Sequence, residues 1–478
     1  MIALYVLLAL IFLFLAVVFI RTLRFRPKKE TPVTITEEKF DRDAAVNALR
    51  ELVVCKTISR YDHAEEDEGE FAKLIDKLPV LYPHVFEACT LTRLPDRALL
   101  FQWTGKTEGQ PTVLMAHYDV VPVMEEGWQK PPFDGIIEDG VLWGRGTLDT
   151  KVTMNGVLFA ANHLIAEGFV PEKDIYFAFS GGEEVNGPGA VHIVDWFEEH
   201  GITPALVVDE GGAVVENVFP GVKGACGMIG IAEKGMIDVE YKTKSNGGHA
   251  SAPKPHTPVG VLSRACCAVE NHPFPLHLTD PVAKMFDTLG RRSTFLYRMI
   301  FANLWCFSWV LDILCKKTGG DLNALMRTTV AFTRMEGSNA NNVIPPEASM
   351  VSNIRLNPAD TVDGGLAYLR KTVNDPMVEI SKIQGTNPSP ISETDCPAWD
   401  KVATAVAATW PGCIVTPYLM MQCSDSRHYG RISNHVYRFS AMALTNEERG
   451  TIHGHNERIR LETIGESVEF YLRLMRQC

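Results

Sequence analysis

Three apolar runs in the first half of the chain each end in polar residues that can bind a cation or move a proton. They are residues 112–116 before His117, residues 175–179 before the stretch 180–184, and residues 206–208 before Asp209. Continuous apolar runs of this length are typical of buried parallel strands. Ligands of open α/β sheets bind outside the carboxyl ends of such strands. We therefore expect an α/β fold in which three strand ends bring side chains to one crevice.

Composition narrows the class of protein. The chain has 478 residues, of which 46% are hydrophobic and 22% charged, a balance that excludes a disordered, collagen-like or multi-span membrane chain. The net charge of -12 argues against nucleic acid as a partner, because such binders need a basic face. The 11 cysteines contain no Cys-x-x-Cys spacing, so neither a disulfide framework nor a thiolate zinc site is expected. They indicate a reducing compartment.

The first twenty residues carry no charged side chain. A helix over them, at about 1.5 Å per residue, spans the hydrocarbon core of a bilayer of about 30 Å, which predicts a single-pass membrane anchor. A cleaved signal peptide is the alternative, but its basic start and small-residue cleavage site are not visible. Basic residues follow at Arg21, Arg24, Arg26, Lys28 and Lys29. By the positive-inside rule they predict a cytoplasmic location for the rest of the chain.

The patterns along the chain predict five segments. They are an anchor at 1–20, a basic and polar linker at 21–38, a catalytic domain at 39–232 and 390–478, and an inserted domain at 233–389. Strand-like alternation from Met236 to Tyr241 marks the start of the insertion. Within it, residues 295–315 are strongly apolar and include Trp305 and Trp309. This stretch predicts either a buried helix or an apolar wall that receives an acyl chain or rests on a bilayer.

Several acidic residues and two histidines form a candidate metal site. They are His117, Asp119, Asp149, Glu183, Glu184 and Asp209, with His453 in a turn near the C-terminus. Singly, each has a structural explanation, such as capping of a helix by Asp149. Gathered in one crevice, the carboxylates repel one another and lose solvation unless cations neutralise them. A metal site is therefore the economical interpretation.

Charge balance favours two divalent ions. With His117, Asp149, Glu184, Asp209 and His453 as ligands, three carboxylates and one hydroxide balance the charge of two such ions. Nitrogen and oxygen ligands without thiolates favour Zn²⁺, with Co²⁺ or Mn²⁺ as replacements. Glu183 then remains as a general base, and Asp119 is placed to orient the imidazole of His117.

Eight motifs between residues 115 and 457 resemble the aminoacylase and carboxypeptidase family of dinuclear zinc peptidases. The resemblance is closest to its carboxypeptidase S and N-fatty-acyl-amino-acid hydrolase subgroup. The motifs are 115–122 (MAHYDVVP), 144–149 (GRGTLD), 182–184 (GEE), 208–212 (VDEGG), 247–251 (GGHAS), 342–346 (NVIPP), 424–427 (SDSR) and 453–457 (HGHNE). They occur in the order typical of the family. The implied fold is a catalytic domain whose mixed central sheet is flanked by helices.

The resemblance also implies a role for each site residue. Asp149 is similar to the ligand that bridges two metals, with His117 and Asp209 on one ion and Glu184 and His453 on the other. Glu183 resembles the general base, and Asp119 the carboxylate that orients His117. The insertion at 233–389 resembles a ferredoxin-like lid and dimerisation domain. Its His249 is similar to a histidine that stabilises the oxyanion in the partner's site, which implies a homodimer.

Asn342 and Arg427 resemble contacts to the free carboxylate of a substrate, with a turn residue and a surface ion pair as the alternatives. The sequence therefore predicts a membrane-anchored metallohydrolase that cleaves the amide beside a free-carboxylate amino acid, in a peptide or an N-acyl amino acid. An aminopeptidase or dipeptidase on the same scaffold is one rival, and it needs a pocket for a free amine. The other is a non-catalytic membrane-tethered binding module, whose usual signature is a missing ligand or base.

Overall fold

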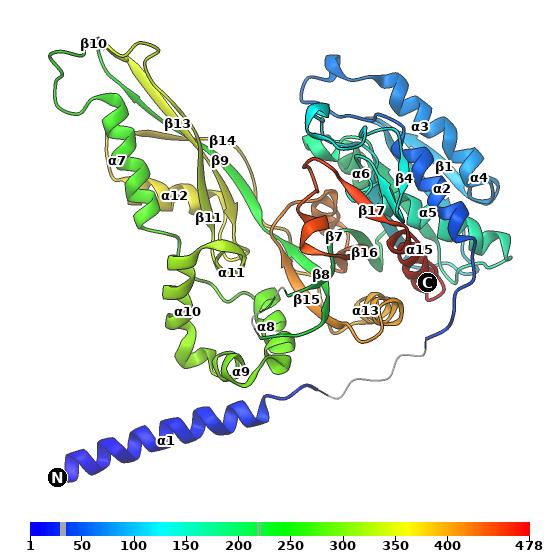
Figure 1. The fold of residues 1–478 in the computed structure, drawn as a ribbon, viewed down its shortest axis with the longest axis horizontal. Coiled ribbons are helices and arrows are strands. Elements are labelled where there is room, and N and C mark those ends of the chain that lie inside the picture. Colours follow the sequence, from blue (N-terminus) through cyan, green and yellow to red (C-terminus); the bar gives the residue numbers. More distant parts are fainter. Residues whose placement is uncertain (29–34, 218, 220) are drawn as a thin grey trace.

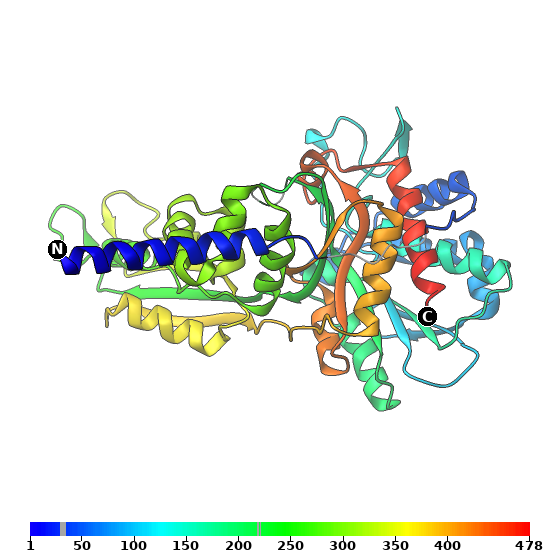
Figure 2. The ribbon, with the colours of Figure 1, turned by 90° about the horizontal axis from the view of Figure 1, so that it is seen from below.

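The computed structural model describes residues 1–28, 35–217, 219 and 221–478. A large sheet covered by helices and a smaller second sheet lie side by side, and a long N-terminal helix lies below the smaller sheet in Figure 1 (Figures 1 and 2). Helix α1 (Ile2–Arg24) extends past the predicted anchor, so that Arg21 and Arg24 lie in the helix and not in a linker. Residues 29–34 of the predicted linker lie outside the described part of the chain. By length and composition, α1 suits a membrane span or a signal sequence.

The central sheet is mixed and has eight strands. In spatial order they are β1 (Thr90–Leu94), β2 (Ala98–Trp103), β6 (Ile175–Ser180), β3 (Thr112–His117), β7 (Leu206–Glu216), β16 (Val436–Leu444), β8 (Ala225–Glu233) and β15 (Ile414–Met420). Strand β3 pairs in parallel with both β6 and β7, so the three predicted strands are neighbours. All residues of β3 and β6 are buried, which explains their continuous apolar sequence. The predicted α/β fold is confirmed.

Helices cover both faces of this sheet because successive side chains of each strand point to opposite sides. Leu114 belongs to the core cluster that also contains buried residues of α2 (Arg42–Val53), α5 (Lys151–Ala166), α13 (Pro397–Thr409) and α15 (Leu461–Met475). Its neighbour Val113 packs with α6 (Gly189–Glu199). The smaller elements around this core are α3 (Glu68–Leu81), α4 (Pro83–Ala88), α14 (Asn446–Arg449), the 3-10 turns η1 (His63–Glu65), η2 (Glu125–Gly127), η3 (Glu183–Val185) and η4 (Asp425–Arg431), and the sheet β17 (Arg458–Arg460), β5 (Val141–Trp143) and β4 (Ile136–Glu138).

The second sheet is antiparallel and is built from the predicted insertion. Its spatial order is β11 (Thr329–Glu336), β13 (Glu347–Leu356), β9 (Gly235–Lys244) and β14 (Glu379–Thr386). Residues alternate between buried and half-buried along β9, and α7 (Pro258–Asn271) and α12 (Val362–Val373) pack on the buried face. The sequence of elements is the β-α-β-β-α-β pattern of ferredoxin-like folds. A small two-stranded antiparallel sheet of β10 (Gly248–His249) and β12 (Val343–Ile344) forms its far tip (Figure 1).

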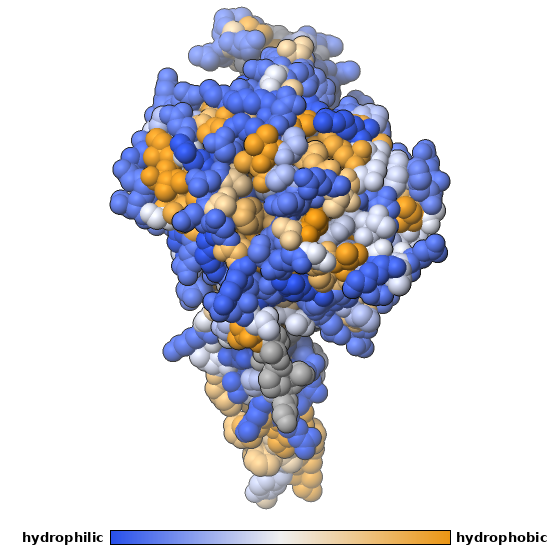
Figure 3. Space-filling model, turned by 90° about the vertical axis from the view of Figure 1, so that its right-hand side faces the viewer, coloured by the Kyte–Doolittle hydropathy of each residue, from blue (hydrophilic) through white to orange (hydrophobic). Residues whose placement is uncertain are grey.

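Four further helices of the insertion lie below the second sheet in Figure 1. They are α8 (Asp280–Arg292), α9 (Phe295–Ala302), α10 (Leu304–Thr318) and α11 (Gly320–Met326). Helices α9 and α10 meet at a bend of 110° and contain the apolar stretch 295–315. The expected buried helix is found only in part, because Leu311 and Cys315 are buried whereas Trp305 and Trp309 are exposed. Apolar side chains gather at the lower end of the molecule, the end where Figure 1 places α1 (Figure 3).

Candidate metal centre

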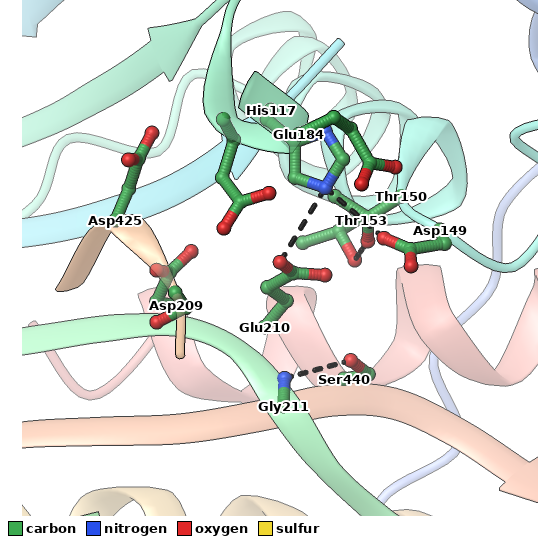
Figure 4. Close-up of polar contacts among 12 residues, drawn as sticks. His117, Asp149, Thr150, Thr153, Glu184, Asp209, Glu210, Gly211, Asp425 and Ser440 are labelled. Atoms are coloured by element: carbon green, nitrogen blue, oxygen red, sulfur yellow. Dashed lines mark hydrogen bonds and ion pairs between the residues drawn. The ribbon is translucent and has the colours of Figure 1, made fainter. Parts of the chain in front are cut away.

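Strand ends and two loops bring the candidate ligands together. His117 is the last residue of β3, Glu184 lies in the turn η3 directly after β6, and Glu210 lies within β7. Asp149 comes just before α5, and His453 comes from the turn before β17. The side chains of His117, Asp149, Glu184 and Glu210 lie around one space (Figure 4). The predicted crevice at the carboxyl ends of the strands therefore exists.

Asp149 lies between two imidazoles. Its Oδ1 is 3.0 Å from Nε2 of His117, and its Oδ2 is 3.0 Å from Nε2 of His453. Each imidazole also faces a second carboxylate. Glu184 Oε2 is 3.1 Å from Nε2 of His453, and Glu210 Oε1 is 3.4 Å from Nε2 of His117. The arrangement has two similar halves that share one carboxylate.

Asp209, expected beside His117, does not join this cluster. Its Oδ2 accepts a hydrogen bond of 3.0 Å from the backbone amide of Ser426, and the carboxylate is buried there. The pairing of β7 with β16 is irregular between Asp209 and Gly212, so the regular alternation of a strand does not separate the two carboxylates, and Figure 4 shows the side chains of Asp209 and Glu210 directed to the same space. The sequence interpretation ended the strand at Val208, whereas β7 continues to Glu216. Glu210 lies beside His117, and the ligand role expected for Asp209 stays a prediction.

Asp119 holds three parts of the site. Its carboxylate accepts the backbone amides of Glu183 at 3.1 Å and Glu184 at 3.2 Å, and the hydroxyl of Ser59 at 2.6 Å. His117 Nδ1 lies 3.4 Å from this carboxylate and 3.1 Å from the carbonyl oxygen of Asp119, to which it can donate. Such contacts leave Nε2 directed at Asp149.

Glu457 is a site residue that the sequence reasoning missed, although one motif contained it. Its buried Oε1 accepts the backbone amides of Gly146 at 3.0 Å and Leu148 at 2.8 Å, while Oε2 pairs with Arg145. These bonds hold the loop that presents Asp149. A carboxylate four residues after His453 gave no signal for this role, because the partners are about 300 residues away in the chain.

The pKa values follow from burial and from the shared carboxylate. Hydrogen bonds from His117 and His453 outweigh burial and hold the pKa of Asp149 well below its usual range. Hydrogen bonds to Asp149 and Glu184 raise the pKa of His453 to about 10. Burial raises the pKa of Glu183 well above its usual range, and burial together with Asp149 raises that of Glu210 to about 8.

The donor set fits divalent cations. Glu184 Oε1 is buried and accepts no hydrogen bond from any residue that the structure describes, which leaves an oxygen ready to bind an ion. Two sets of three residues have donor atoms within 4.8 Å of one another, namely His117, Asp149, Glu184 and His117, Glu183, Glu210. Closely spaced carboxylate and imidazole donors of this kind are ligands of zinc and related metals.

Comparison with known proteins agrees with this geometry. Residues 113–477 match the family described as "Peptidase family M20/M25/M40". The chain belongs to this family. It is 32% identical over 471 residues to a probable carboxypeptidase S-like 2 of Dictyostelium discoideum, covering 96% of this chain and 90% of the relative. It is 33% identical over 459 residues to the N-fatty-acyl-amino acid synthase/hydrolase PM20D1 of Xenopus tropicalis, covering 94% and 88%.

A solved structure shares the fold of this M20/M25/M40 peptidase. The M20 family metallo-carboxypeptidase Sso-CP2 of Sulfolobus solfataricus superposes with a TM-score of 0.66 at 17% identity, over 90% of this chain and 98% of that one. Family membership and the cluster around Asp149 together identify the protein as a metal-dependent amide hydrolase.

The remaining predicted residues of this M20/M25/M40 peptidase lie in two different places. Arg427 is in η4 of the catalytic part, where its Nη2 donates to Oδ1 of Asn186 at 3.1 Å. His249 and Asn342 lie at the tip of the second sheet, where the amide of Ala250 donates to the carbonyl of Asn342. Figure 1 places that tip far from β7, so one chain does not bring these two residues to its own metal centre.

Proposed function

We propose that the protein hydrolyses N-acyl amino acids that carry an apolar acyl chain. The observation that carries this choice is a cavity of about 740 Å³ that begins at Asp149 and Glu184. Apolar residues make up much of its remaining wall, among them Met228, Met285, Leu325, Met420, Met442 and Leu444. A peptide substrate exposes amide groups that need hydrogen-bond partners, whereas a hydrocarbon chain suits such a wall. The name of the Xenopus relative supports the same substrate class.

For the cofactor we propose two divalent ions, with Zn²⁺ as the metal and Co²⁺ or Mn²⁺ as substitutes. His117, Asp149 and Glu210 would hold one ion, and Asp149, Glu184 and His453 the other, so that Glu210 takes the role first assigned to Asp209. When bound, such a pair of ions acidifies a water molecule and polarises the amide carbonyl. The three carboxylates supply the negative charge that the ions require.

Glu183 serves as the general base in this proposal. Its raised pKa lets the carboxylate take a proton and return it near neutral pH, and the leaving amine is the acceptor. The hydrogen bond from its backbone amide to Asp119 holds Glu183 beside the ligand Glu184. Arg427, at the surface of the catalytic part, binds the free carboxylate of the amino acid.

The second sheet acts as a lid and dimerisation domain in this proposal. His249 is exposed at its tip and is remote from the metal centre of the same chain, which supports a role in the partner's site. Asn342 comes directly before β12, which pairs with β10, and would reach the partner's site together with His249. A homodimer with two-fold symmetry would bring both tips to the opposite metal centres.

We also propose that α1 anchors the protein in a membrane, with the catalytic part in the cytoplasm. Helix α1 has 23 residues, and 6% of its most apolar window is buried inside the protein. The basic residues after it support this orientation. The protein should stay in the membrane fraction at high salt, and a reporter after Cys478 should be cytoplasmic. A mature chain that begins beyond Ile20 would identify α1 as a signal sequence instead.

The main test uses the full-length protein with zinc. Turnover is measured with long-chain and acetyl derivatives of one amino acid, with dipeptides, and with a chelator. Glu183→Gln should keep two metal equivalents while turnover falls by about 10²–10⁴, the usual contribution of general acid–base catalysis. Glu184→Gln, its matched neighbour, should lose one equivalent.

Four results would overturn the proposal. Better kcat/KM for dipeptides with a free C-terminus would make the protein a carboxypeptidase, and preference for a free amine would make it an aminopeptidase. Turnover that resists the chelator would show that the reaction does not need the metals. No turnover with any substrate would favour a binding module.

A further inference from the structure

The bend between α9 and α10 exposes an unusual set of apolar side chains. Trp305 is 58% exposed, Trp309 64%, and Leu296 63%. Phe295, Ile313 and Leu314 add to the same surface, with exposures between 48% and 58%. Exposed apolar surfaces of this kind mark contacts with a partner protein or a membrane.

Helix α1 packs directly on this bend through polar contacts. The side-chain amide of Asn303, the residue between α9 and α10, is fully buried. It donates at 3.2 Å both to the carbonyl oxygen of Val18 and to the hydroxyl of Thr22. From the other side, the guanidinium of Arg21 donates to the carbonyl oxygen of Ala302 at 3.2 and 3.3 Å, at the C-terminus of α9. Side-chain amides and hydroxyls that bond across helices are typical of helix pairs inside membranes.

Aromatic contacts extend this packing along α1. The ring of Phe14 lies 5.8 Å from that of Trp305, and the ring of Phe19 lies 6.1 Å from that of Phe295. Figure 1 shows α1 below the second-sheet part, with α9 near the C-terminal end of α1, and in Figure 2 α1 passes in front of that part. The exposed surface of the bend is thus continuous with that of the proposed anchor.

The position of these contacts along α1 indicates how deep the bend would lie in the bilayer. Phe14 is six residues before Ile20, the end of the uncharged stretch, which corresponds to about 9 Å along a helix. Interfacial helices enter a bilayer by about 5–10 Å. Charged groups mark the level of the headgroups, since the guanidinium of Arg291 donates to the carbonyl of Arg26 and Lys28 pairs with Asp287 at 3.3 Å.

We propose that the bend between α9 and α10 inserts into the cytoplasmic leaflet beside α1, so that two elements hold the protein against the lipid. This proposal rests on the membrane role of α1 given above. Helices α8 and α11, which flank the bend in the chain, supply Met285 and Leu325 to the wall of the cavity. Insertion of the bend would therefore hold that wall of the active site beside the bilayer.

The experiment measures tryptophan fluorescence of the full-length protein in phosphatidylcholine vesicles that carry bromine on their acyl chains. The chain has eight tryptophans, and two of them lie in the bend. In the double variant W305F/W309F the fraction of emission that the brominated lipid quenches should fall to about half or less of the wild-type fraction. The control is Trp196→Phe on α6, a half-buried ring of the catalytic part, which should not lower this fraction. Bromine near the headgroup should quench more strongly than bromine near the chain end.

Equal quenching of the wild type and of W305F/W309F would overturn the proposal. So would protection of both rings from brominated lipid and from acrylamide in water, because that result would indicate a second protein chain on this surface. Fluorescence does not depend on turnover, so a protein that hydrolyses nothing but shows the expected quenching would refute the proposed function alone. A protein that leaves the membrane at high salt would refute the anchor.

Discussion

Exchange of the neighbouring carboxylates Asp209 and Glu210 for amides tests the geometry of the metal centre directly. In Glu210→Gln, the ion held by His117 and Asp149 loses one of its three protein ligands. In Asp209→Asn, the side-chain oxygen can still accept the backbone amide of Ser426. The two variants each remove one negative charge at adjacent positions, so they differ mainly in whether the carboxylate beside His117 or the one beside Ser426 is changed.

The expected loss for Glu210→Gln follows from two opposing energies. A carboxylate and a divalent ion about 4 Å apart attract by about 8 kcal/mol at an effective dielectric constant of about 20. Against this, burial and Asp149 raise the pKa of Glu210 to about 8, so removal of its proton at pH 7 before the ion binds costs about 1 kcal/mol. Several kcal/mol of attraction remain, which corresponds to a metal affinity about a hundredfold or more weaker in the variant.

Elemental analysis of the purified variants and competition with a chromophoric chelator measure stoichiometry and affinity. Glu210→Gln should retain one tightly bound equivalent and bind the second about a hundredfold more weakly. Asp209→Asn should retain two, and circular dichroism should show both variants folded. Loss of one equivalent in Asp209→Asn together with full occupancy in Glu210→Gln would refute the placement of Glu210 at the metal.

Three further outcomes follow from the contacts around the site. Asp119→Asn should weaken metal binding by about 10–100-fold, as for other residues that orient ligands, and titration calorimetry measures it. Glu457→Gln should lower the free energy of unfolding by about 3–5 kcal/mol because it leaves Arg145 buried without its charge partner, whereas Glu447→Gln, which disrupts a surface pair with Arg458, should cost less than about 1 kcal/mol in the same urea titration. Mixed His249→Ala and Glu183→Gln subunits should regain about a quarter of wild-type turnover if His249 acts in the partner's site, and no recovery after proven subunit exchange would exclude that role.

The parts of the fold that depend on local sequence were predictable. Strands β3 and β6 are apolar throughout because both of their faces are buried, and the alternation in β9 reflects one covered face. The candidate ligands His117, Asp149, Glu184 and His453 could be named because short motifs contain them in a known order. The parallel pairing of β3 and β6 brings His117 and Glu184 together, whereas Asp149 and His453 come from loops before α5 and β17.

Features that depend on tertiary contacts were not predictable. Whether Asp209 or Glu210 lies nearer to His117 depends on the irregular path of β7 between Asp209 and Gly212, and the motif contains both carboxylates. The hydrogen bonds of Glu457 to the loop before α5 and of Asn303 to α1 join residues about 300 positions apart. No periodicity in the chain marks such pairs, since each partner looks like an ordinary polar residue until the fold brings them together.

The order of strands in the central sheet has a consequence for how the protein is made. Strand β16 lies between β7 and β8, yet the ribosome produces it about 200 residues after them. The second sheet is contained in the chain between β9 and β14 and can form earlier, as domains generally do during synthesis. Until β16 emerges, the part of β7 before Val214, which does not pair with β8, therefore has an open edge that invites pairing with other chains. His453 and Glu457 follow β16, so a nascent chain lacks these two residues of the candidate metal centre until almost all of it has been translated.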